Sequence, residues 1–118
     1  MRLPREEIAA IRRVLDAGLK GSSAELYLFG SRTQDYQKGG DIDLLLLAPA
    51  TVVKNLRSRK HFLLAELKKE LGDQRIDLTL AEPAKASQDP FLRRVIRSAV
   101  LLQRWKPVAR GGRKADGC

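Results

Sequence analysis

The chain has few of the residues on which several common kinds of functional site depend. Of its 118 residues, one is cysteine and one is histidine, and aromatic residues make up 5%. Cys118 is the last residue, which excludes an internal disulfide and a cysteine-clustered zinc site. His61 is expected within a helix, and we interpret it as a surface or half-buried residue and not as a ligand or a base. A functional site on this chain therefore has to rely on other side chains.

Long apolar runs are also absent. No run approaches the roughly 20 residues that a membrane-spanning helix requires. The start, residues 1–7, lacks the apolar core of a signal peptide. We therefore expect a cytoplasmic protein with no membrane association.

Basic residues are in excess, 23 Lys and Arg against 14 Asp and Glu, for a net charge of +9. Residues 104–118 hold five basic residues and one acidic residue, which is almost half of the excess. We expect one folded domain over residues 1–103 and a basic flexible tail over residues 104–118. The charge favours nucleic acid, acidic proteins or phosphate-rich ligands. Direct nucleic-acid binding is opposed by three acidic residues at the expected site.

Hydrophobic periodicity divides the chain into alternating helices and strands. Helices are predicted over residues 4–19 and 52–71 and from residue 90, with Asp89 as the N-cap, and a short helix can start at Ser31. Strands are predicted over residues 26–29, 41–47 and 75–80. The last helix is expected to carry four arginines, Arg93, Arg94, Arg97 and Arg104.

This order predicts an α/β (α+β) fold, with a small mixed β-sheet flanked by helices. About a dozen residues link the first two strands, which allows them to be antiparallel. The long helix over residues 52–71 suits a parallel crossover between the second and third strands.

Asp41 and Asp43 lie two residues apart at the start of the second strand, so both carboxylates project from one face. A divalent cation between them would turn their mutual repulsion into binding energy. Oxygen ligands of this kind suit magnesium or manganese. The alternative is structural, with Asp41 capping the turn after Gly39-Gly40 and Asp43 as a solvated strand-end residue.

Asp77 is a third carboxylate within an apolar strand, on the face opposite Ile76, Leu78 and Leu80. If the second and third strands are neighbours, three carboxylates meet on one surface. Such a set can hold two metal ions about 4 Å apart, as in-line phosphoryl displacement requires. The alternative is that Asp77 forms a salt bridge with Arg75 or a nearby lysine.

Gly30, Ser31 and Arg32 follow the first strand directly. A helix starting here would present free backbone N–H groups to a phosphate, and glycine would let the ligand approach closely. Ser31 adds a hydroxyl donor, and Arg32 adds a forked cationic donor for a triphosphate. Alternatively, Ser31 is an ordinary N-cap and Arg32 is a surface residue paired with Asp35.

Gly30-Ser31-Arg32, eight intervening residues, Asp41-Ile42-Asp43-Leu44 and a later Ile76-Asp77-Leu78 together resemble a known family. The pattern is similar to that of the minimal nucleotidyltransferases of the DNA polymerase β superfamily. The resemblance covers most of residues 5–103.

The resemblance implies a polymerase-β-like nucleotidyltransferase fold in which Gly30 and Ser31 hold the triphosphate and Asp41, Asp43 and Asp77 bind the metals. Asp77 would also help to activate the acceptor hydroxyl, while the role of Arg32 stays open between phosphate binding and structure. Larger members have acceptor-binding domains, and this chain shows none. The chain resembles the antitoxins that adenylylate a tyrosine of a HEPN-domain toxin with ATP. We therefore expect ATP and Mg²⁺ as cofactors, a HEPN-domain toxin as partner, and a homo- or hetero-oligomer. The alternative is a non-catalytic antitoxin that neutralises its partner by covering it.

Overall fold

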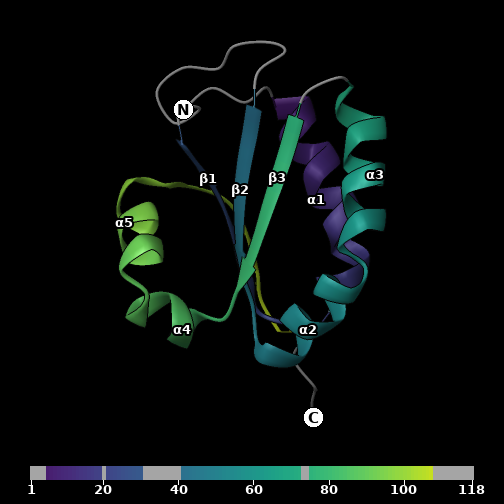
Figure 1. Cartoon of the computed structure of the whole chain (residues 1–118). Coiled ribbons are helices and arrows are strands. Elements are labelled where there is room, and N and C mark those ends of the chain that lie inside the picture. The colour runs from purple at the N-terminus through teal and green to yellow at the C-terminus, as the bar shows by residue number, and fades with distance from the viewer. Residues whose placement is uncertain (1–4, 20, 31–40, 73–74, 108–118) are drawn as a thin grey trace.

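The computed structural model describes residues 5–19, 21–30, 41–72 and 75–107, and for Asp41 it describes the backbone alone. A four-stranded sheet forms the middle layer, with helices on both of its faces (Figure 1). The elements in chain order are α1 (Arg5–Leu19), β1 (Ala24–Phe29), β2 (Asp41–Leu47), α2 (Ala50–Ser58), α3 (Lys60–Leu71), β3 (Arg75–Ala81), α4 (Pro83–Gln88), α5 (Pro90–Ser98) and β4 (Val100–Trp105). The predicted fold class, a mixed sheet flanked by helices, is confirmed.

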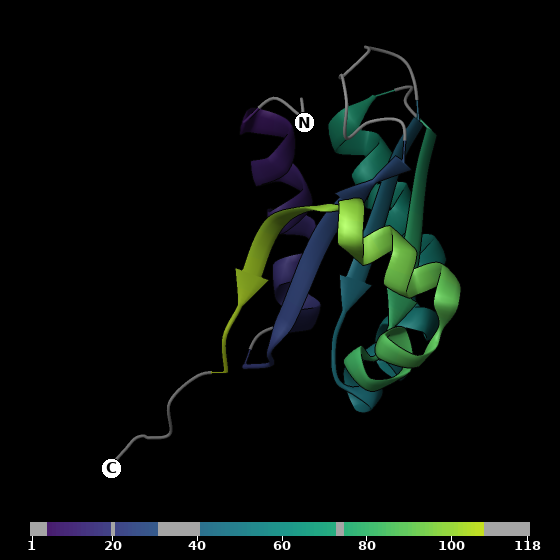
Figure 2. The ribbon, with the colours of Figure 1, turned by 90° about the vertical axis from the view of Figure 1, so that its left-hand side faces the viewer.

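The sheet has the strand order β3-β2-β1-β4. The strand β1 runs antiparallel to both of its neighbours, whereas β2 and β3 are parallel. The parallel pair is joined through α2 and α3, as a crossover connection requires. Figure 2 shows β4 beside β1, at the edge of the sheet remote from β3.

Two apolar clusters, one on each face of the sheet, account for the four consecutive leucines of β2. Leu44 and Leu46 point into the larger cluster, beneath α1, α2 and α3, and both are fully buried. Leu45 and Leu47 point to the other face, which α4 and α5 cover. Side chains of a strand alternate between its faces, so an unbroken apolar run is stable only when both faces are covered. The leucine run of β2 is thus buried on both faces of the sheet.

The single helix predicted over residues 52–71 is wrong, because the chain forms two helices that meet at Arg59. The Arg59 backbone has φ −114° and ψ 13°, outside the helical range. The Ser58 hydroxyl donates to the carbonyl oxygen of Asn55 at 2.8 Å, and such a bond offers the backbone an alternative to helix. The longest helix is α1 and not this segment.

The C-terminal part differs from the prediction in two places. Residues 83–88, for which no helix was predicted, form the short helix α4, which buries Ala86 alone. Residues 100–105 form β4, so Arg104 lies on a strand and not on the last helix. The domain boundary expected after residue 103 falls within this strand. Trp105 packs against the larger core cluster.

No helix among the described residues is long and apolar enough to cross a membrane.

Candidate active site

Two of the predicted acidic residues lie side by side. Asp43 of β2 and Asp77 of β3 are direct partners in the parallel ladder. Neighbouring strands are about 4.8 Å apart, and residues in register share a face, so the two carboxylates project together. Asp43 is half-buried and Asp77 is exposed. A pair of carboxylates open to solvent at this spacing can share a cation.

Gly30, directly after β1, lies against the carboxylate of Asp43. A Cβ on Gly30 would lie 2.5 Å from Oδ2 of Asp43, so a side chain here could be accommodated only if the carboxylate moved away. Gly30 also has φ +83°, a left-handed conformation that glycine adopts without steric cost. The backbone conformation therefore favours glycine, and a side chain at this position would displace the Asp43 carboxylate. The phosphate-binding motif and the acidic motif, predicted from separate segments, meet at this contact.

Three of the predicted site residues are described incompletely or not at all. Asp41 is the first residue of β2, in register with Arg75, and its side chain lies outside the description. Ser31 and Arg32 lie outside the described residues. Their assignment to metal and phosphate binding stays a prediction.

The structural alternative for Asp77 was an ion pair with Arg75 or a lysine. Within the described part of the chain, Asp77 forms no salt bridge. Its exposed carboxylate is thus not explained by a structural ion pair there. Among the described side chains, no three His, Cys, Asp or Glu residues gather closely enough to hold a metal ion. The side chain of Asp41 is not among those described.

The sheet face that carries the two carboxylates is only partly covered. Asp43, Leu45 and Leu47 share this face of β2, and α4 and α5 pack over the two leucines. Asp43 and Asp77 lie nearer the start of their strands, at the end of the sheet away from α4 in Figure 1. Phe29 is the antiparallel partner of Asp43 and is partly buried against the same apolar cluster. Sequence reasoning did not identify Phe29 as a neighbour, because this requires the β1–β2 register.

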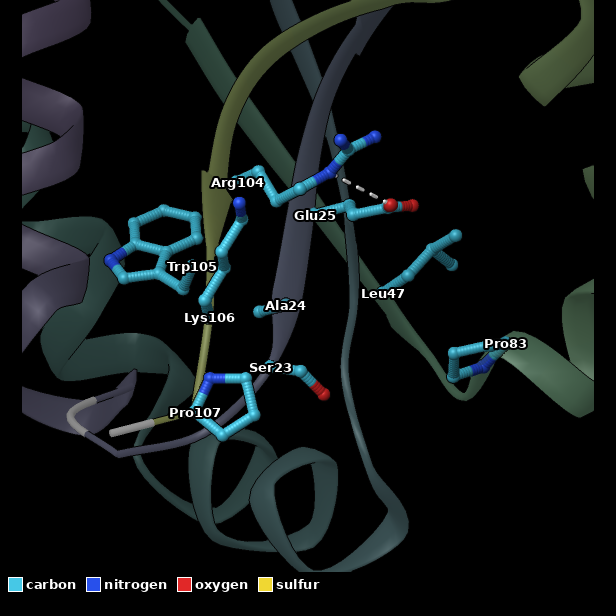
Figure 3. Close-up of a pocket in the computed structure, with 9 residues that line it drawn as sticks. All are labelled: Ser23, Ala24, Glu25, Leu47, Pro83, Arg104, Trp105, Lys106 and Pro107. Carbon is cyan, nitrogen blue, oxygen red and sulfur yellow. Dashed lines mark hydrogen bonds and ion pairs between the residues drawn. The ribbon is translucent and has the colours of Figure 1, made fainter. Parts of the chain in front are cut away.

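A cleft of about 310 Å³ lies at the opposite end of the sheet (Figure 3). It is lined by the start of β1, the end of β4 and Leu47 and Pro83. Arg104 Nε and Glu25 Oε2 form an ion pair across it at 3.2 Å. Its lining includes neither Gly30 nor the two carboxylates, so this cleft does not contain the candidate site. Its size alone does not make it the active site.

Glu25 also accepts a hydrogen bond from the hydroxyl of Tyr27 at 2.8 Å. The pKa of Tyr27 is raised above its usual value of 10.0, chiefly by burial and further by the hydrogen bond and the charge of Glu25. Arg104 acts in the opposite direction. The phenol therefore stays protonated and neutral at physiological pH, and Tyr27 serves this face of the sheet as a packing residue.

Residues 8–102 match the family model of the nucleotidyltransferase domain, which belongs to the DNA polymerase β superfamily. The chain belongs to this family. The match covers all nine elements, apart from the start of α1 before residue 8 and the end of β4 after residue 102. A search of curated proteins found no match.

Given this family, the candidate catalytic centre of the chain is the group formed by Gly30, Asp43 and Asp77. His61 lies elsewhere, on α3 at the other face of the sheet, and it is exposed. The centroid of its ring lies 4.0 Å from that of the Phe62 ring. The interpretation of His61 as a surface helix residue is confirmed. General nucleotidyl transfer follows from the family, and the finer questions are the donor, the metal and the acceptor.

Proposed function

We propose that this nucleotidyltransferase domain transfers AMP from ATP to a hydroxyl group, with a divalent cation. One observation carries the proposal, namely the pairing of Asp43 with Asp77 on an accessible face, with Gly30 against the Asp43 carboxylate. Two adjacent like charges in register destabilise a sheet unless a cation or proton compensates them. Holding them beside a glycine, where a side chain would displace the Asp43 carboxylate, is consistent with a site for a metal-bound phosphate.

The donor set fits magnesium, with manganese as a substitute. Carboxylate oxygens are the ligands that these hard cations prefer, and the described pair offers no sulfur or imidazole. In this proposal Asp41, Asp43 and Asp77 hold the cation. When bound there, the cation would neutralise charge on the phosphates.

The protein's own residues have separate roles in the proposed reaction. Gly30 allows the triphosphate to approach the backbone, and Ser31 and Arg32 bind its non-transferred phosphates. Asp77 accepts the proton of the acceptor hydroxyl as the hydroxyl oxygen bonds to the α-phosphorus. The bond from that phosphorus to the bridging oxygen breaks, and pyrophosphate leaves. Catalysis is then mainly positioning and charge neutralisation.

We further propose that the acceptor is a tyrosine of a HEPN-domain toxin and that the chain acts in the cytoplasm as the antitoxin. The support is the resemblance of the Gly-Ser-Arg and Asp-x-Asp spacing to that of minimal nucleotidyltransferases.

The experiment uses the full chain, labelled ATP, Mg²⁺ and the protein encoded by the adjacent gene. Intact-mass measurement should show one AMP added to that protein, on a tyrosine, and no addition with Asp43→Asn or Asp77→Asn. A folded Asp43→Asn variant that still transfers AMP would refute the site. Neutralisation of the partner's toxicity by Asp43→Asn without modification would instead support the binding-module alternative.

A further inference from the structure

A second recess lies on the same sheet face as the carboxylates, between α4 and α5. It has a volume of about 390 Å³. Apolar side chains form much of its lining, and two arginines of α5 stand at its side. We call it the α4–α5 groove, formed by Leu47, Pro83, Ala86, Ser87, Ile96, Arg93 and Arg97.

The arginines of this groove have no partner within the described part of the chain. Arg93, Arg94 and Arg97 are exposed, and none forms an ion pair or side-chain hydrogen bond with the described residues. Arg93 and Arg97 are four residues apart on α5, a spacing at which like charges repel each other. No acidic residue lies on α5 to offset them. This surface is therefore suited to an anionic partner.

The groove lies along the same face of β2 as the proposed active site. Leu47 in its floor is four residues from Asp43, and the two side chains point to the same side of the strand. At about 3.3 Å per residue, the separation along the strand is roughly 13 Å. A macromolecule seated in the groove would thus reach the carboxylates without leaving this face.

We propose that the α4–α5 groove docks an acidic, amphipathic segment of the acceptor protein and so presents the acceptor hydroxyl to the active site. This inference rests on the proposed function, because it presumes a protein acceptor. The apolar floor would bury apolar side chains of the segment, while Arg93 and Arg97 pair with its carboxylates. The floor favours a protein over nucleic acid, since a phosphate backbone gains nothing from Leu47, Ala86 or Ile96.

Binding can be tested without the natural acceptor. The probe is a short, fluorescently labelled helical peptide with leucines along one face and glutamates beside them. A second peptide has its leucines replaced by serine, and a third probe is a single-stranded RNA oligonucleotide. Each is titrated against the full chain, the R93E/R97E variant and the R93Q/R97Q variant. The control is K68E/K69E, which reverses two exposed lysines of α3 on the other face of the sheet.

The leucine–glutamate peptide should bind the wild type and the control equally and R93E/R97E at least about tenfold more weakly. The neutral R93Q/R97Q variant should be intermediate, and the serine peptide should bind weakly throughout. Melting temperatures identify any variant whose loss reflects unfolding, because Arg97 lies in the last helical turn, where a positive charge is favourable. No peptide binding, or equal binding by R93E/R97E, would overturn the inference. So would an RNA that binds through the same arginines more tightly than the peptide.

The peptide experiment is independent of catalysis. D43N should bind the leucine–glutamate peptide like the wild type, since Asp43 lies outside the groove. With the adjacent-gene protein, R93E/R97E should raise the KM for that acceptor by at least about tenfold and leave the KM for ATP unchanged. Transfer without peptide binding overturns the docking inference alone. Peptide binding without transfer overturns the proposed function, and with it the presentation of an acceptor hydroxyl, while the binding of an acidic, amphipathic segment to the groove stands.

Discussion

The backbone of Gly30 and the carboxylate of Asp43 are in such close contact that the space for a single methyl group is missing between them. A Cβ on Gly30 would lie 2.5 Å from Oδ2 of Asp43 and 3.4 Å from its Cγ. The contact joins the end of β1 to the third residue of β2. The contact places the backbone that is expected to receive a phosphate beside a carboxylate that is expected to bind its metal.

Gly30→Ala should therefore damage the site beyond its cost to the fold. Gly21→Ala is a matched control, because Gly21 has φ +77° and a Cβ there would meet nothing within 4 Å. Each variant places alanine in the left-handed region, which costs about 1–2 kcal/mol. Gly21→Ala should lower the melting temperature by a few degrees and keep its ATP affinity. Gly30→Ala should also weaken MgATP binding by at least about tenfold, measured by calorimetry. Equal ATP affinity in the two variants would contradict the role of the contact.

If Asp43 and Asp77 share a cation, the effect of Asp77→Asn on the melting temperature should depend on whether metal is present. In EDTA, Asp77→Asn should leave the melting temperature unchanged or raise it, because it removes like-charge repulsion between register neighbours. Mn²⁺ should raise the melting temperature of the wild type, since a ligand that binds the folded state stabilises it, and should do so much less for Asp77→Asn. Glu66→Gln, which removes an exposed carboxylate of α3, is the control and should keep the wild-type response. A metal-induced shift that survives in Asp77→Asn would exclude Asp77 as a ligand.

The sequence was sufficient to predict those elements whose ends are determined by residues close to them in the chain. The strand over residues 41–47 was predicted at its observed ends because a leucine run lies between a Gly-Gly pair and a proline. The cap of α5 was predicted from Asp89, whose Oδ1 accepts from the backbone N–H groups of Phe91 and Leu92 at 2.8 and 3.2 Å. These features depend on neighbours in sequence.

Features set by distant segments could not be predicted in this way. The strand β4 is held by pairing with β1, more than 70 residues earlier, and its sequence has no alternation of apolar and polar residues. The helix α4 is too short for a periodic pattern. For the site, the sequence predicted that Asp77 would approach Asp43 if their strands were neighbours. The register that pairs them, and the contact of Gly30 with Asp43, follow from tertiary structure.

The raised pKa of Tyr27 predicts a loss of stability at alkaline pH. The folded state holds the phenolic proton more tightly than the unfolded state, whose pKa is near 10.0. This contribution to stability is complete below pH 10 and is lost as the pH rises through the folded-state pKa. In a Tyr36→Phe background Tyr27 is the single tyrosine, so its phenolate can be titrated by absorbance.

Two substitutions should move this titration in opposite directions. Glu25→Gln should lower the pKa of Tyr27 but leave it above its usual value, because burial is the largest cause of the shift. Arg104→Gln should raise it further, since the charge of Arg104 favours the phenolate. Shifts of the same sign in both variants would contradict the assigned causes.

The indole of Trp105 should anchor β4 to α1. Its Nε1 donates to Oδ1 of Asp16 at 2.7 Å, and its ring packs against the larger core cluster. Asp16→Ala removes the acceptor and should cost about 1 kcal/mol of unfolding free energy, whereas Trp105→Phe removes the donor and part of the packing. In a double-mutant cycle measured by urea unfolding, the two changes should couple by about 0.5–1.5 kcal/mol. Strict additivity would mean that the hydrogen bond contributes nothing and that packing alone holds the strand. Coupling of the expected size would place Trp105 within the folded domain, beyond the boundary expected after residue 103.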